Sequence, residues 1–284
     1  MTGPLPDRRN DFDVTNTVRV SSPDAVREAV AKLFHATWPG ATFDPLWMAF
    51  HDYERLFHGD LPGYFGCDTV YHDLQHTLDM TLAMARLLVG YERNCAPEER
   101  VGGERAVLGL IAALFHDSGY IRREDEPRWD NGAQFTNWHV SRSAEFLSAY
   151  MNGVGLSHLA KRASLLVHFT GYEQNPEDIE LDDPLDTHVG HLLGTGDLLA
   201  QMADRCYLEK CRDRLYAEFV LGGIAFGDAL GGSPRYESGL DLLRQTPVFW
   251  RQAAYQRMNR QFNRAYRHME VLFDGRNPYM EWID

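Results

Sequence analysis

Residues 106–116 read AVLGLIAALFH, and Asp117 follows directly. The run is longer than the roughly 5–6 residues of an average strand and is rich in alanine and leucine, so it predicts a buried helix. This helix ends on His116 and Asp117, whose side chains are common metal ligands. The most apolar part of the chain is therefore expected to carry candidate ligands into the protein interior.

Helical periodicity extends in both directions from this segment. Ser22-Pro23-Asp24 and Asp44-Pro45 are typical helix starts, because proline fits the first helical turn. No segment shows the alternation of apolar and polar residues that is typical of a strand. We therefore predict an all-α fold, a helical bundle with additional helices at both ends. The predicted helices begin at Pro23 and Asp44 or span 73–92, 106–116, 138–151, 156–169, 188–200, 204–221 and 247–272, with loops at 59–66, 121–136 and 171–187.

The composition and organisation of the chain suit one folded unit. Hydrophobic residues make up 44% of the 284 residues, which is enough to fill a sizeable core. No repeat, low-complexity stretch or linker divides the sequence. We predict a polar N-terminal arm at 1–22 and a single helical domain at 23–284, with a metal-binding core at about 70–210.

Charge and cysteine content narrow the functional classes. The formal net charge of −13 argues against a non-specific nucleic-acid binder, and we expect no nucleic-acid partner. The four cysteines form no C-x-x-C pair and are expected to be reduced thiols. Neither a signal peptide nor a run of roughly 18 apolar residues is visible, so we expect a soluble cytoplasmic protein without a membrane partner. The oligomeric state cannot be read from these features.

Histidine and aspartate residues recur in a pattern that suits a metal centre. His72 and His76 in YHDLQH lie four residues apart on one helix face. The other candidates fall on or beside separate predicted helices, and a helical bundle can direct such side chains to one point. Imidazole and carboxylate ligands suit divalent Fe, Mn or Zn, with Mg and Ni as further options, and a set of this size fits two ions bridged by one carboxylate. The predicted ligands are His76, His116, Asp117, His139, His168 and Asp197.

These motifs resemble those of the HD-domain superfamily of metal-dependent phosphohydrolases over residues 70–210. The matching residues are His76, the His116-Asp117 doublet in AALFHDSGY and Asp197 in GTGDLLAQMAD. YHDLQHTLDM is also similar to the Tyr-His-Asn-x-x-His-x-x-Asp-Val element of class I cyclic nucleotide phosphodiesterases, although an aspartate replaces its asparagine. The resemblance implies an HD-domain helical bundle that cleaves a phosphomonoester or phosphodiester, expected to be that of a nucleotide.

The resemblance also implies a role for each residue. His76, His116, Asp117 and Asp197 would hold the first ion, and Asp117 would share the second with two further histidines. Those histidines, His139 and His168, resemble the additional ones of HD-GYP phosphodiesterases. His72 and Asp117 are the predicted catalytic residues: a metal-activated hydroxide would attack phosphorus, and His72 would protonate the leaving oxygen. Arg142 and Lys161 are candidate ligands for the substrate phosphate.

Several alternatives remain open at this level. Some HD-fold proteins are di-iron oxygenases with the same ligand set, and a non-catalytic sensor module could keep the fold. Other residues could also replace members of the predicted ligand set or support it. These are Asp204 in place of Asp197, His188 and His191 in place of His139 or His168, and Asp73 or Asp79 as partners of a ligand histidine. The arginines of the last helix are expected to face solvent or acidic neighbours: Arg251, Arg257, Arg260, Arg264 and Arg267.

Overall fold

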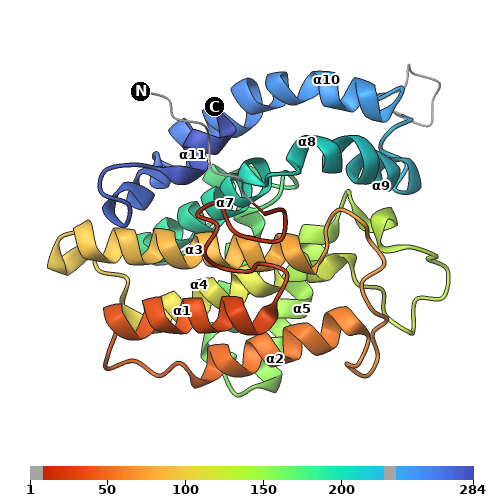
Figure 1. Ribbon diagram of the computed structural model, residues 1–284. Helices are drawn as coiled ribbons and strands as arrows, with labels where there is room; N and C mark the ends of the chain where they lie inside the picture. The colour runs from red at the N-terminus through yellow and green to blue at the C-terminus, as the bar shows by residue number, and fades with distance from the viewer. Residues whose placement is uncertain (1–8, 227–234) are drawn as a thin grey trace.

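The computed structural model describes residues 9–226 and 235–284, and in these ranges the chain is built from helices (Figure 1). The extended pairings within the described ranges are two isolated bridges, Phe12–Arg19 and Tyr64–Arg123, and no sheet forms there. The predicted all-α fold is confirmed. No helix among the described residues has both the length and the apolarity needed to cross a membrane.

Three helices cross the middle of the structure and position the candidate site. α3 (Leu74–Asn94) packs against both α4 (Gly102–Phe115) and α7 (Pro184–Ala203), which also contact each other. Gly109 of α4 lies where the three helices meet. A Cβ atom at this residue would come within 2.8 Å of side-chain atoms of Met84 in α3 and Val189 in α7, so the close approach requires glycine.

The remaining helices surround this centre (Figure 1). α1 and α2 lie at the bottom of the view, and α10 and α11 lie at the top. A continuous set of buried apolar side chains extends from Val14 to Tyr279 and joins these elements. The bounds are α1 Pro23–Thr37, α2 Asp44–His58, α5 His139–Gly153, α6 Ala160–Leu166, α8 Tyr207–Lys210, α9 Tyr216–Leu221, α10 Gly239–Phe249 and α11 Pro278–Ile283.

Two predicted boundaries are wrong, and local chemistry explains both. α7 begins at Pro184 rather than at residue 188, because the Asp183 side chain accepts a hydrogen bond from the Leu185 N–H and caps the helix. The long helix predicted at 247–272 does not exist as one element.

The C-terminal region is instead divided into several helical segments. α10 starts at Gly239, where the Ser238 side chain caps it. Two π-helical segments follow, and the second ends before Asn263 and Arg264, whose φ angles are 48° and 57°. Two successive residues in the left-handed region cannot continue a right-handed helix. A 3-10 segment resumes at 265–271.

The described part of the N-terminal arm, residues 9–22, is held by a buried carboxylate. Asp13 is fully buried and accepts hydrogen bonds from the backbone N–H groups of Thr17 and Val18. Its Oδ2 lies 2.7 Å from Nη2 of Arg86 in α3, and Arg86 also donates to the hydroxyl of Tyr279 in α11. This ion pair and the adjoining hydrogen bond therefore join the N-terminal arm and α11 to the central helix α3.

We predict that Asp13→Asn lowers the free energy of unfolding by about 3 kcal/mol, because it leaves the buried Arg86 charge without its partner. Chemical denaturation monitored by circular dichroism measures the loss. Asp11→Asn is the matched control, since the pair of Asp11 with Arg19 is solvent-exposed and should contribute less than about 1 kcal/mol. Equal effects of the two substitutions would contradict the prediction.

The same carboxylate predicts an acid-dependent loss of stability. Burial opposes the charge of Asp13, but Arg86 and the surrounding hydrogen-bond donors outweigh it and lower the pKa to about 2. Because the folded pKa lies below the unfolded value of about 3.9, the stabilisation is complete above about pH 5 and is lost progressively as the pH falls through 2. Denaturation curves between pH 5 and 2 should show this component in the wild type and lack it in Asp13→Asn.

Candidate metal centre

The three central helices each supply a candidate ligand to one buried point. His76 lies in the first turn of α3, where its N–H donates to the side chain of Asp73, the N-cap residue. His116 and Asp117 follow the end of α4, and Asp197 lies within α7. All four ligand candidates are buried. The apolar helix 106–116 predicted from the sequence therefore carries the doublet into the core.

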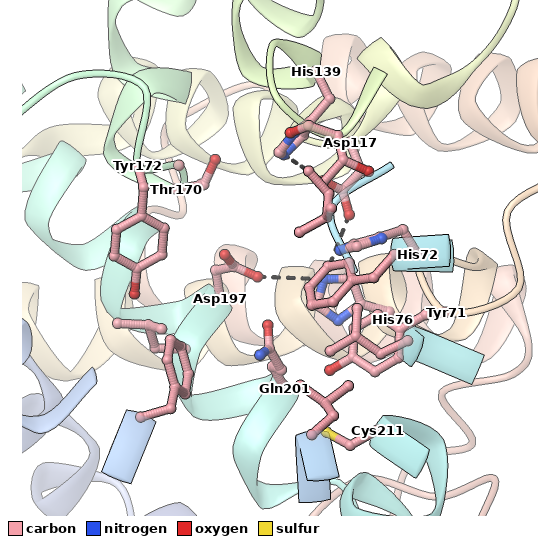
Figure 2. Close-up of a pocket in the computed structure, with 18 of the residues that line it drawn as sticks. Tyr71, His72, His76, Asp117, His139, Thr170, Tyr172, Asp197, Gln201 and Cys211 are labelled. Carbon is pink, nitrogen blue, oxygen red and sulfur yellow. Dashed lines mark hydrogen bonds and ion pairs between the residues drawn. The ribbon is translucent and has the colours of Figure 1, made fainter. Parts of the chain in front are cut away.

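The side chains of His76, Asp117 and Asp197 point towards one another (Figure 2). Nε2 of His76 lies 3.3 Å from Oδ1 of Asp197 and 3.5 Å from Oδ2 of Asp117. Nε2 of His116 lies 3.1 Å from the same Asp117 oxygen and 3.7 Å from that of Asp197. Ligand atoms that bind one transition-metal ion at about 2.0–2.2 Å lie roughly 3–3.6 Å from each other. The spacing of His76, His116 and Asp197 suits a single ion.

The hydrogen bonding of the cluster also favours a cation. Nε2 of His116, Oδ2 of Asp117 and Oδ1 of Asp197 are buried and make no hydrogen bond of normal geometry among the described residues, although His116 and Asp117 form an ion pair at 3.1 Å. Buried polar atoms without partners are rare and costly, and a metal ion held by His76, His116 and Asp197 would satisfy two of these three atoms. Nδ1 of His116 lies 2.8 Å from the carbonyl of Ala113, which directs Nε2 towards the cluster. The His76, His116 and Asp197 group can hold a metal ion.

Asp117 lies between this group and another imidazole. Its second oxygen, Oδ1, is 3.8 Å from Nε2 of His139, as expected for a carboxylate that bridges two ions. Nδ1 of His139 lies 2.8 Å from the carbonyl of Thr136, which orients the ring. Burial lowers the pKa of His139 despite the nearby Asp117 carboxylate, so the ring is neutral and can act as a ligand.

His168 lacks the ion-pair contacts that join the other candidate ligands within the described ranges. It lies in the turn Val167–Phe169 and is buried, and its Nδ1 has no hydrogen-bond partner. No ion pair joins it to Asp117 or to Asp197 within the described ranges. The second ion, which would need His139 and His168 together, stays a prediction.

The alternative ligands lie outside the cluster. Asp204 accepts from its own backbone turn and pairs with Lys210. His188 packs its ring against Tyr91 and His268, at a centroid distance of 4.0 Å for Tyr91, and His191 neighbours it on the same helix.

Glu218 is a site residue that sequence reasoning missed. It lies in α9, 146 residues after His72, and only 1% of it is exposed. Oε1 lies 2.7 Å from Nδ1 of His72, while Oε2 accepts from the backbone N–H groups of Tyr71 and His72. The sequence gives one local indication that Glu218 is buried: it is an acidic residue within the apolar segment YAEFVL at 216–221.

Glu218 changes the protonation of His72. Burial opposes a charge on the imidazole, but the Glu218 carboxylate outweighs it and raises the pKa of His72 to about 9. The carboxylate itself is shifted the other way: burial opposes its charge, yet His72 lowers its pKa. The pair is therefore an imidazolium and a carboxylate at neutral pH.

The candidate ligands border a cavity of about 610 Å³. His72, His76, His116, Asp117, His139 and Asp197 all line it, and Figure 2 shows several of these side chains facing Thr170 and Tyr172 across the open space. Tyr120 stacks on the rings of both His72 and His139 at centroid distances of 4.4 Å. The more distant wall combines apolar and aromatic side chains with amides such as Gln201 and Gln245.

The two predicted phosphate ligands do not line this cavity. The Arg142 guanidinium donates to both oxygens of Glu126 and to the carbonyls of Gly119 and Ile121. Lys161 is exposed, with its ammonium 3.4 Å from Asp182. The structure thus gives Arg142 a role in holding the loop that follows Asp117.

Comparisons with protein-family models, with curated proteins and with solved structures found no match.

We predict that the purified chain binds a divalent transition-metal ion. His116→Ala should lower the affinity by at least about 100-fold, because losing only a residue that hydrogen-bonds to a metal ligand already lowers metal affinity by about 10–100-fold. Titration with Mn²⁺ or Zn²⁺ and elemental analysis measure the change. His158→Ala is the control, because His158 is exposed and lies outside the cluster. Equal metal content in the two variants would show that the ion binds elsewhere.

Proposed function

We propose that the chain is a metal-dependent phosphohydrolase of the HD type that cleaves a phosphomonoester or phosphodiester of a nucleotide. The observation that carries the proposal is the convergence of His76, His116, Asp117 and Asp197 at one buried point. Inward atoms of His116, Asp117 and Asp197 have no hydrogen-bond partner among the described residues, and a protonated histidine borders the same cavity. The sequence resemblance described above agrees with this chemistry.

The four clustered residues would hold the first divalent ion, and Asp117 would share a second with His139 and His168. When bound, such ions supply Lewis acidity to a phosphoryl oxygen and lower the pKa of a water molecule. The chain contributes fixed carboxylate and imidazole groups whose positions are set by the crossing of α3, α4 and α7. Because these groups are already oriented, they need little rearrangement during the reaction.

His72 would donate a proton to the leaving oxygen. Glu218 occupies Nδ1, so Nε2 is the nitrogen available for proton transfer to a ligand in the cavity. With a pKa of about 9, the ring is protonated at neutral pH, as an acid must be before the reaction. Tyr120, stacked on the ring, limits its rotation. His72 is the catalytic residue in this scheme, and Glu218 is a positioning residue.

The size of the cavity agrees with a nucleotide-sized substrate, because small-molecule sites commonly measure about 300–1,000 Å³. Aromatic rings and amides on the far wall can contact a base or sugar, while the metal cluster at the other end meets the phosphate. The acidic net charge of the chain does not oppose this arrangement, since bound cations dominate the local field.

The decisive experiment is a metal-dependent screen over nucleotide monophosphates, diphosphates and cyclic phosphates, with protein loaded with Mn²⁺, Fe²⁺ or Zn²⁺. We expect phosphate-ester cleavage that requires the ion and is lost in Asp197→Asn. Oxygen uptake by the iron-loaded protein, recorded in parallel, tests the oxygenase alternative. Oxygen consumption with substrate loss but without ester cleavage would overturn the hydrolase proposal. Metal binding without either activity would favour a sensor module.

We predict that Glu218→Gln lowers kcat roughly 100-fold, because general acid catalysis contributes about 10²–10⁴-fold and the substitution removes the charge that keeps His72 protonated. The pKa of His72 should fall towards its ordinary value, so the alkaline limb of the pH–rate profile should move to lower pH.

Glu209→Gln is the matched control for this prediction, since Glu209 is exposed on the neighbouring α8. Steady-state kinetics from pH 6 to 10 measure kcat and KM separately. A lower kcat with an unshifted alkaline limb would mean that Glu218 acts only on the local fold.

A further inference from the structure

A polar groove of about 680 Å³ adjoins the metal-site cavity. It lies between segment 172–177 and residues 252–261, and it shares Tyr172, Glu173 and Gln252 with the lining of the metal-site cavity. The two spaces therefore adjoin at these residues. The groove is more polar than the far wall of the cavity. Its lining contains two arginines and four glutamines together with two glutamates, so its charged side chains are Arg257, Arg260, Glu173 and Glu177.

Arg257 is unusual among the arginines of the chain. Both Arg257 and Arg86 are 6% exposed, but Arg86 pairs with Asp13, whereas no ion pair of Arg257 exists within the described residues. The expectation that this arginine faces solvent or an acidic neighbour is therefore wrong. Burial without an ion pair lowers its pKa. A buried charge that lacks a counter-ion is strongly unfavourable, which requires a compensating group.

The surrounding residues compensate the Arg257 charge only in part. Its Nη2 donates to the carbonyls of Gly171 and Phe169 at 2.6 and 3.4 Å, while its buried Nε has no hydrogen-bond partner. Glu173 lines the groove, but its carboxylate accepts from the backbone N–H groups of Val140 and Ser141 at the start of α5. The guanidinium also lies over the rings of Tyr172 and Phe262, 4.3 and 5.2 Å from their centroids, so it is held in place at the groove without a carboxylate counter-ion among the described residues.

Two further features favour an anionic ligand. Arg260 is exposed at the same groove and makes no ion pair within the described ranges, so a second cation is available there. Asp197 is the carboxylate whose charge acts on Arg257 across the site, and an ion bound by Asp197 would offset that charge. Loading the metal centre therefore increases the net positive potential in the groove.

We propose that this groove is an anion subsite, in which Arg257 and Arg260 bind a second phosphate or carboxylate group of the substrate while the scissile phosphate lies at the metal centre. The claim that the anion belongs to the substrate rests on the proposed function, whereas the claim that the groove binds an anion does not. The glutamine side chains would supply neutral hydrogen bonds around the same anion. A substrate with two separated anionic groups would then be preferred over one with a single group.

The first test is calorimetric titration of the full-length, metal-loaded protein with sulfate at constant ionic strength. We expect Arg260→Gln to raise the sulfate dissociation constant roughly tenfold, as for the loss of one charge-assisted hydrogen bond. Arg257→Gln should have a larger effect. Arg267→Gln is the matched control, because Arg267 is exposed and lines neither space. Since Arg260 is exposed, its variant tests the subsite even if Arg257→Gln does not fold.

A second arm separates the subsite from the metal centre. His116→Ala should keep arginine-dependent sulfate binding while it loses the ion. Sulfate binding that disappears in His116→Ala but survives in both arginine variants would place the anion at the metal centre and overturn the subsite. If the protein hydrolyses no phosphate ester but still binds sulfate through Arg260, the proposed function fails and the subsite stands.

The third arm asks whether the anion is part of the substrate. We expect the ratio of kcat/KM for adenosine 3′,5′-bisphosphate to that for adenosine 5′-monophosphate to fall roughly tenfold in Arg260→Gln. An unchanged ratio together with weakened sulfate binding would show that the groove takes a free anion, and it would overturn the assignment to the substrate.

Discussion

The structure depends on a group of buried ionisable side chains at the crossing of α3, α4 and α7. Two imidazoles and two carboxylates approach to between 3.1 and 3.7 Å, and three of their atoms have no hydrogen-bond partner among the described residues. An apolar core of this size would be more stable without them unless a cation completes the group. The long apolar helix α4 supplies the hydrophobic burial that compensates for placing these side chains inside the protein.

The segments around this group are fixed by charges that act over long distances in the chain. Glu218 holds the start of the YHDLQH segment through two backbone N–H groups and one imidazole. Arg142 holds the loop after Asp117 through Glu126 and two carbonyls. Both residues limit the movement of side chains that border the cavity. The resulting rigidity is what a site needs if its polar groups are to be oriented before a ligand binds.

The distribution of charge around the cavity is uneven. The metal cluster and Glu218 form an acidic end, whereas Arg257 and Arg260 line the adjoining groove. In a chain with a net charge of −13, two neighbouring arginines at one groove, one of them buried without an ion pair among the described residues, are a local exception. Their position beside a site proposed to act on phosphate esters gives this exception a chemical meaning, because guanidinium groups bind phosphate and carboxylate well.

The sequence by itself determined the helical class and the core of the candidate metal centre. Periodicity and composition indicate helices because they act over three or four residues, and His76, His116 and Asp197 lie in motifs that are readable locally. Some helix boundaries differ from those that periodicity predicts. The reasons are local: side-chain caps at Asp183 and Ser238, and left-handed backbone at Asn263 and Arg264.

Only the tertiary structure decided which other residues belong to the site. Glu218 reaches His72 across 146 residues and Arg257 reaches Gly171 across 86, so no local pattern marks either contact. Arg142 and Lys161 have the charge that a phosphate needs, but they lie away from the cavity lining. Whether a charged side chain binds a ligand or supports the fold depends on burial and on its partners in space, and these are properties that the order of residues does not display.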